Sequence, residues 1–195
     1  MGTDGKMPAL NTAVRETIPH LRSVAAQNPH AELLVRALAF STGAHWHVAE
    51  PMPAERLVWT DLVADGLSDL GAALLEVARQ LATPPMPARA LPPAIVLISD
   101  GLPTDDWEAG LAALMATPWG ARSIRLAIGI GRDADHEVLE RFIATEGVQP
   151  MHASNPEQLL RMLRWATVHA GRLASTAAKG EPPPYVVPGI SEVVW

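Results

Sequence analysis

The stretch "IVLISDGLPTDDW", residues 95–107, decides the fold class. A short apolar run ends on Asp100, a Gly-Leu-Pro turn follows, and two more carboxylates open a helix-like segment. Strands buried in a parallel sheet have such continuous apolar runs, and α/β sheets bind ligands beyond the carboxyl ends of their strands. Asp100 therefore marks a strand end at which a functional site is expected.

Strand-like and helix-like segments alternate on both sides of this stretch. Apolar residues at helical spacing and the Asn155-Pro156 start signal predict helices, and apolar runs between turn residues predict strands. The predicted strands are 33–40, 44–50, 94–99, 123–130 and 148–152, the first two as a hairpin. The predicted helices are 10–25, 69–82, 105–116, 135–144 and 156–171. This order predicts an α/β fold, a doubly wound and mostly parallel sheet with helices on both faces.

Composition limits the classes of partner. The chain has 195 residues, a net charge of −6 and no cysteine. The negative charge argues against nucleic acid as the main partner, and no stretch predicts a signal peptide or a membrane span. We therefore expect a soluble cytoplasmic protein with a folded domain over residues 1–172. Residues 173–195 are expected to form a Pro-rich linker and an extended apolar tail that docks rather than moving freely.

The acidic residues after the strand have two interpretations. Asp105 is placed to cap the following helix, with Glu108 three residues on as a capping box. Asp100 lies before the turn and too far from that helix to cap it. An unpaired buried carboxylate is costly, so Asp100 needs a partner, and a hard cation such as Mg²⁺, which prefers oxygen ligands, is a natural one.

These segments resemble a known family. The strand followed by Asp-Gly-x-Pro-Thr-Asp-Asp-Trp is similar to the third metal-site loop of von Willebrand factor A (VWA) domains, particularly their TerY-like bacterial branch, which is associated with tellurium resistance. "DGLSDLGAALLEVARQL" (65–81) resembles the second loop, and "IRLAIGIGRDADHEVLERF" (124–142) resembles the fifth strand, its Gly-x-Gly exit and the next helix. The resemblance covers residues 1–172 and implies a VWA, Rossmann-like fold.

The resemblance also implies a metal-ion-dependent adhesion site. In the family, Mg²⁺ is held by Asp-x-Ser-x-Ser after the first strand, by a Thr of the second loop and by an Asp of the third loop. By position, the Asp is Asp100 and the Thr is replaced by Ser68. Ser68 is alternatively the N-cap of helix 69–82. Asp100 and Ser68 are the predicted metal ligands, and no catalytic residue is expected.

The family's first strand and its Asp-x-Ser-x-Ser motif have no counterpart in this sequence. That strand lies in the family between those matching 33–40 and 94–99, so its absence would leave rows of backbone groups unpaired. The gap could be closed by direct pairing of 33–40 with 94–99, by a borrowed strand such as "YVVPG" of the tail, or by a longer protein that starts upstream of Met1. We favour the third explanation, because the match to the family resumes at Met1, and the upstream coding DNA tests it.

The function expected from this resemblance is that of a non-catalytic protein-binding module in a bacterial stress or tellurium-resistance system. A partner protein would supply a carboxylate to the Mg²⁺. One alternative is a metal-independent scaffold with a degenerate site. A further alternative is a Mg²⁺-dependent phosphoryl-transfer enzyme, which is disfavoured because Leu102 stands where a second acid is usually required. The identity of the partner and the oligomeric state are left open.

Overall fold

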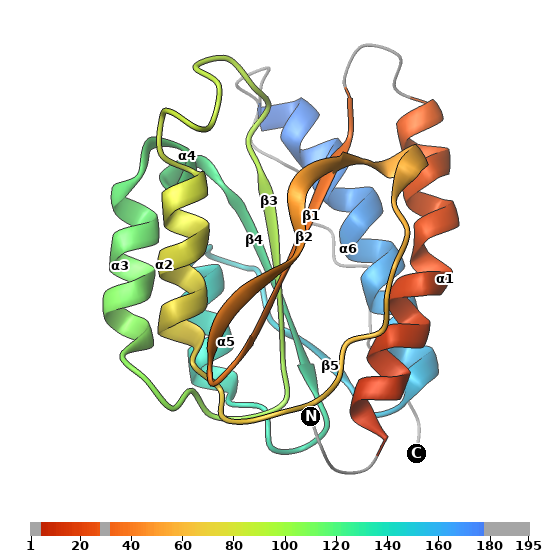
Figure 1. Cartoon of the computed structure of the whole chain (residues 1–195), viewed down its shortest axis with the longest axis vertical. Helices are drawn as coiled ribbons and strands as arrows, with labels where there is room; N and C mark the ends of the chain where they lie inside the picture. The colour runs from red at the N-terminus through yellow and green to blue at the C-terminus, as the bar shows by residue number, and fades with distance from the viewer. Residues whose placement is uncertain (1–4, 28–31, 178–195) are drawn as a thin grey trace.

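The computed structural model describes residues 5–27 and 32–177 (Figure 1). The strands are β1 (Leu34–Ser41), β2 (Gly43–Pro53), β3 (Ala94–Ser99), β4 (Ile124–Ile130) and β5 (Met151–Ala153). The helices are α1 (Lys6–Ala26), α2 (Leu70–Gln80), α3 (Trp107–Ala116), α4 (Pro118–Arg122), α5 (His136–Ile143) and α6 (Pro156–Ala177), with a short 3-10 helix at Ala54–Arg56. The alternation of strands and helices confirms the predicted α/β class.

Element boundaries lie within about four residues of their predicted positions, with two exceptions. β3 has the predicted bounds, and the Asn155 side chain caps α6 by accepting from the Gln158 amide at 2.9 Å. The first exception is α6, which continues to Ala177, beyond its predicted end and into the segment assigned to the linker. The second is α4, a short helix that was not predicted and is capped by the Thr117 hydroxyl. The tail, residues 185–195, lies outside the described residues.

The strands form two separate sheets. β3, β4 and β5 form a parallel sheet in that order, and β1 and β2 form an antiparallel hairpin as predicted. No ladder joins β1 to β3 within the described ranges, so the suggestion that 33–40 pairs directly with 94–99 is wrong for this part of the chain. The other two explanations for the gap involve residues outside the described ranges and stay predictions.

Two helical layers enclose the strands (Figure 1). α2, α3 and α5 lie on one side, and α1 packs along α6 on the other. All residues of β4 are buried, which is expected for the middle strand of a parallel sheet covered on both faces. The strands β3 to β5 run in one direction and end at a common edge, called the carboxyl edge below. No helix in the described part of the chain is long and apolar enough to cross a membrane.

Candidate functional site

Two loops are hydrogen-bonded to each other at the carboxyl edge. One loop, residues 61–69, precedes α2, and the other, residues 100–106, follows β3. Thr104 joins them: its backbone N–H donates to the Ser68 carbonyl at 3.0 Å, and its hydroxyl accepts from the Ser68 N–H at 3.0 Å. The same hydroxyl donates to Asp69 Oδ1 at 2.8 Å. The predicted second and third loops therefore meet, as the resemblance implied.

Asp69 extends this network to the β1–β2 hairpin. Its Oδ2 accepts from the Gly43 N–H at 2.7 Å, and its own N–H donates to the Ser41 carbonyl at 3.0 Å. The hydrogen bonds from Gly43 and Thr104 stabilise the carboxylate and lower the pKa of Asp69 below its ordinary value. The end of β1 and the loop after β3 are thus held at the same edge through one aspartate.

The capping assignment for Asp105 is wrong. Its carboxylate caps α2 across the loop junction, accepting from the N–H groups of Gly71 and Ala72, each at 2.8 Å. Asp106, one residue later, caps α3 by accepting from the Ala109 N–H at 3.0 Å. The unpaired N–H groups at the start of any helix attract acids, and sequence spacing alone cannot tell which helix a loop acid will cap.

Ser68 is not the N-cap of the helix that follows it. α2 begins at Leu70, its N-cap residue is Asp69, and its first amides are satisfied by Asp105. The Ser68 hydroxyl makes no hydrogen bond to any other described residue. The structure therefore removes the capping interpretation and leaves the hydroxyl oxygen of this half-buried residue available to a ligand.

Asp100 has a cation beside it already. Lys6, the first residue of α1, places its Nζ 3.4 Å from Asp100 Oδ2 and 3.4 Å from Asp133 Oδ2. The Lys6 and Asp100 side chains are each 11% exposed, whereas Asp133 is 80% exposed. Burial alone would lower the pKa of Lys6, but its attraction to Asp100 and Asp133 outweighs this and raises the pKa above its ordinary value.

A glycine makes room for this ion pair. Gly131 follows β4 with a φ of 78°, and a Cβ at this position would lie 3.0 Å from Lys6 Cε. The Gly-x-Gly exit of β4 thus lets the Lys6 side chain pass close to the backbone on its way to Asp100. Sequence analysis missed Lys6 and Asp133, because nothing in the sequence pattern links residues this far apart along the chain.

The oxygen ligands at this edge suit a hard cation, although the protein supplies few of them. Ser68 and Asp100 line one cavity, and a hydroxyl and a carboxylate are ligands that Mg²⁺ accepts. Among residues 5–27 and 32–177, no group of three or more His, Asp or Glu side chains is placed to hold a metal. Water and a partner would have to complete the shell of an ion bound by Ser68 and Asp100, which therefore stay predicted ligands.

Exposed apolar side chains surround the junction of the two loops. Leu67, next to Ser68, is 59% exposed, Leu102, two residues after Asp100, is 64% exposed, and Val63 is 86% exposed. The loop that carries Val63 and Leu67 is anchored to α1, because the Asn11 side chain bonds both the N–H and the carbonyl of Leu62, at 2.9 and 2.8 Å. An anchored loop that presents leucines beside polar oxygens is typical of a surface that binds another protein.

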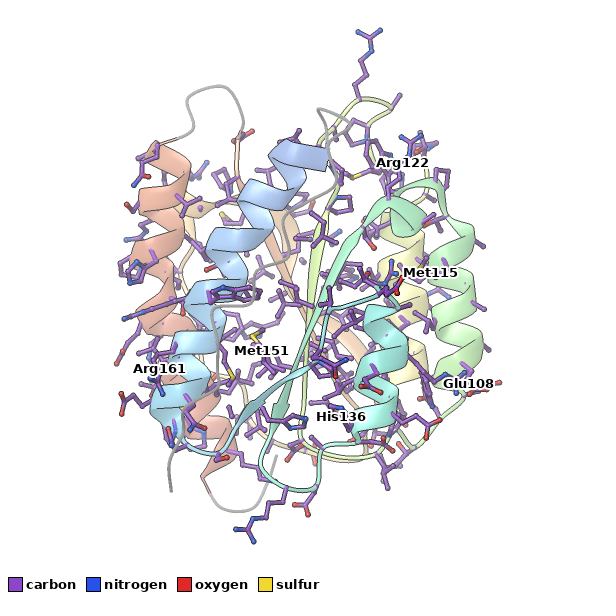
Figure 2. The ribbon with its side chains drawn as sticks, turned by 180° about the vertical axis from the view of Figure 1, so that it is seen from behind. Glu108, Met115, Arg122, His136, Met151 and Arg161 are labelled. Carbon is purple, nitrogen blue, oxygen red and sulfur yellow. The ribbon has the colours of Figure 1, made fainter. Side chains whose placement is uncertain are left out.

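A histidine pair lies farther along the same edge. His136 Nδ1, at the start of α5, is 3.0 Å from His152 Nε2 in β5, and His136 Nε2 is 3.1 Å from Glu140 Oε1. Burial, and then the charge of His136, lower the pKa of His152. Figure 2 shows His136 and Glu108 at this edge and Arg122 at the opposite one.

Known structures share this arrangement of helices and strands. A von Willebrand factor type A protein from Catenulispora acidiphila aligns over 80% of this chain and 38% of its own, with a TM-score of 0.57 and 16% identity. The ArnB paralog VWA2 from Sulfolobus acidocaldarius aligns over 75% and 39%, with a TM-score of 0.52 and 18% identity. The fold is VWA-like. Proximal thread matrix protein 1 from the mussel byssus aligns over 84% and 42%, with a TM-score of 0.61 and 15% identity.

These similarities establish the fold of the chain and no more. The identities lie between 15% and 18%, and the matched region spans only 38% to 42% of the length of these three structures. No protein-family model and no curated protein matches the chain. The expected VWA, Rossmann-like α/β fold is therefore confirmed, whereas partner and metal must be argued from the site itself.

Proposed function

We propose that this VWA-like chain is a non-catalytic protein-binding module and that the carboxyl edge is its binding face. The observation that carries the proposal is the junction of the two loops by Thr104, which holds Ser68 and Asp100 at one edge beside the exposed Leu67 and Leu102. Rigid loops that combine apolar contacts with a few fixed polar groups supply both the area and the specificity of a protein interface.

In this proposal Mg²⁺ is bound by Asp100 and Ser68, and a carboxylate of the partner completes its shell. The Ser68 hydroxyl, which bonds no other described residue, and the low exposure of the Asp100 side chain support the assignment. The proposal also includes a bacterial stress or tellurium-resistance context, which rests on the resemblance of the loops. It includes a cytoplasmic location, which rests on composition.

Calorimetric titration of Mg²⁺ into the full chain tests the metal site. We expect weak binding that Asp100→Ala abolishes and Ser68→Ala weakens, and we expect added acetate, a minimal carboxylate, to tighten it. Glu146→Gln is the charge-matched control, because Glu146 is an exposed acid in the loop at the other end of α5. Mg²⁺ binding that survives Asp100→Ala would remove Asp100 from the site. The fold should be retained in Asp100→Asn, since Lys6 keeps a second carboxylate neighbour in Asp133.

A metal-independent scaffold is the second candidate, and the Lys6–Asp100 ion pair favours it. An ammonium 3.4 Å from Asp100 Oδ2 supplies the positive charge that the buried carboxylate needs without any metal. If calorimetry detects no heat that depends on Asp100, this candidate replaces the first. Turnover of p-nitrophenyl phosphate in the presence of Mg²⁺, lost on Asp100→Asn, would instead establish the phosphoryl-transfer alternative and contradict a non-catalytic role.

A further inference from the structure

A large cavity lies between the two sheets. Every residue of β1 and of β3 lines the same cavity, which has a volume of about 2470 Å³. β1 pairs only with β2, and β3 only with β4, within the described residues, so each strand presents its second edge to this cavity. We call the space between these two edges the β1–β3 slot.

Burial along the strands indicates that β1 and β3 each lack a neighbouring strand on the side of the slot, among the described residues. β4, with a strand on each side, is buried at every residue, whereas β3 is buried only at Leu97 and β1 at none of its residues. About half of the N–H and C=O groups of a strand point to each edge, so both edges carry rows of backbone groups that need partners. An occupant that forms ladders with β1 and β3 would satisfy these rows.

The walls of the slot specify an extended, apolar occupant. Leu10 and Val14 of α1 line it on one side, and Leu74 and Val77 of α2 line it on the other. Small-molecule sites are typically about 300–1,000 Å³, well below the volume of this cavity. Apolar helices on both sides and unpaired strand edges along its length are what a central strand of a parallel sheet requires.

We propose that the β1–β3 slot is filled by the C-terminal segment of the same chain, residues 190–195, which adds a strand parallel to both neighbours. This segment takes the place of the upstream strand that the sequence alone favoured. The segment reads "ISEVVW", so four of its residues are apolar, and its length equals that of β3. The preceding Pro188-Gly189 marks the strand start, because proline cannot donate to a ladder. The proposal does not depend on the binding face at the carboxyl edge.

The chain path permits this placement. α6 borders the slot, since Leu163 and Thr167 line the cavity, and its end at Ala177 lies at the end of the molecule where β1 and β3 begin (Figure 1). Residues 178–189 can span roughly 40 Å when extended. This reach exceeds the ~26 Å length of β1, an eight-residue strand, so the linker is long enough to bring residue 190 to the start of the slot. A strand entering there runs in the direction of β1 and β3, whose ends are joined through Asp69.

The handedness of the connection is also correct. The step from β3 to β4 passes through α3 on one side of the sheet, whereas α6 lies on the opposite side (Figure 1). The connection from β5 through α6 to the slot crosses the sheet in the opposite direction to the β3–α3–β4 crossover, and its helix lies on the opposite face. Because both are reversed, the two connections have the same hand. Crossovers between parallel strands in one sheet almost always share this hand.

Arg36 fixes the expected register. It lines the slot from β1, stacks on Trp46 at 3.7 Å and donates to Gln80 Oε1 at 2.7 Å and to the Ala49 carbonyl, but its buried Nε has no acceptor among the described residues. A parallel strand that begins with Ile190 beside Leu34 brings Glu192, the only charged residue of the segment, beside Arg36. Opposite charges on neighbouring strands stabilise a sheet, and this pairing offers an acceptor to the buried Nε of Arg36.

A disulfide trap tests the position of the segment in the full chain. The protein has no cysteine, so Leu38→Cys with Val194→Cys introduces the only two thiols, at positions that the register places side by side. Neighbouring strands lie about 4.8 Å apart, within the range that a disulfide spans. We expect an intrachain disulfide in the monomer, formed at least about tenfold faster than in the control Leu38→Cys with Glu181→Cys, whose second thiol lies in the linker. Disulfide-linked dimers would show that a second copy donates the strand, and equal rates in the two variants would show that the segment does not enter the slot. Either result overturns the proposal.

Hydrogen exchange with a charge swap tests the register. Glu192→Arg and Arg36→Glu should each accelerate exchange of the β1 and β3 amides about tenfold, and the double swap should restore most of the protection. Glu181→Arg, with the same charge change in the linker, should leave exchange unchanged. Fast exchange of these amides in the unaltered chain would mean that the slot is open. Slow exchange in every variant would mean that another strand fills it. Both outcomes contradict the proposal.

Discussion

Replacing Lys6 by methionine tests what neutralises Asp100. The substitution keeps a long apolar side chain but removes the ammonium that lies 3.4 Å from Asp100 Oδ2 and 3.4 Å from Asp133 Oδ2. At 3.4 Å and an effective dielectric constant of 20, the Coulomb attraction between two unit charges is ~5 kcal/mol, which is an upper limit for the Lys6–Asp100 pair. Methionine recovers the cost of desolvating the ammonium, so we expect a net loss of about 2 kcal/mol in the free energy of unfolding.

The matched control is Asp133→Asn. Asp133 is the same distance from the Lys6 ammonium as Asp100, but it is 80% exposed, against 11% for Asp100. Solvent screening should therefore limit its effect to about 0.5 kcal/mol. The comparison separates proximity to the ammonium, which both aspartates share, from burial, which only Asp100 has.

The pH dependence of the Lys6 effect has a defined sign. Because the pKa of Lys6 is raised in the folded protein, the ion pair contributes its full stability below the ordinary lysine value of 10.5 and loses it as the pH rises through the raised pKa. The difference between the unaltered chain and Lys6→Met should therefore be constant near neutral pH and shrink in strongly alkaline solution.

Urea unfolding in the presence of a chelator, and again with Mg²⁺ in excess, measures both consequences. Lys6→Met should lower the unfolding midpoint in chelator, and Mg²⁺ should recover more of the loss in this variant than in the unaltered chain, because the cation no longer competes with the ammonium. A midpoint that is the same with and without Lys6, at every pH and with or without Mg²⁺, would refute the role of Lys6 as the counter-ion of Asp100.

Three further substitutions test the packing and the electrostatics around the site. Gly110→Ala should destabilise the protein by about 2 kcal/mol in urea unfolding, because its Cβ would lie 2.6 Å from the carbonyl oxygen of Gly71 where α2 and α3 cross; unchanged stability would show that the helices can separate. Asp105→Asn should cost about 1–2 kcal/mol by weakening the cap of α2, and an unchanged melting temperature would contradict the cap. Burial and His136 lower the pKa of His152, so the folded state disfavours protonation of this side chain, and the free energy of unfolding should fall as the pH drops below about 6.5. His152→Phe should flatten this dependence of stability on pH. The same dependence in the variant would exclude His152 as its source.

The sequence predicted the elements better than the contacts between them. Apolar runs such as 94–99 and start signals such as Asn155-Pro156 depend on local chemistry, and β3 and α6 begin where they were expected. The meeting of the second and third loops was also predicted, but only through family resemblance. Loop 61–69 and loop 100–106 have no local signal that would bring them together.

The rest depended on spatial neighbours that spacing does not reveal. Asp105 caps α2 through the Gly71 N–H, 34 residues earlier in the chain, although the neighbouring α3 was the local candidate. Lys6 reaches Asp100 because α1 starts at the carboxyl edge beside Gly131, a position fixed by packing against α6. The separation of β1 from β3 likewise follows from which strands lie side by side, which the apolar pattern of single strands cannot specify.

The Lys6–Asp100 ion pair also determines how metal and partner binding are related in the proposed function. If the Lys6 ammonium stabilises Asp100 by ~2 kcal/mol, it lowers the affinity of this site for a competing cation about thirtyfold. Ser68 and Asp100 offer two oxygens, whereas Mg²⁺ takes about six, so most of the shell must come from water and from the partner. A partner carboxylate that joins the shell helps Mg²⁺ to displace Lys6, and by reciprocity Mg²⁺ raises the affinity for the partner by the same factor. The isolated protein therefore keeps Asp100 neutralised through Lys6, and its dependence on Mg²⁺ should become strong only when a carboxylate ligand is present, which the acetate titration measures directly.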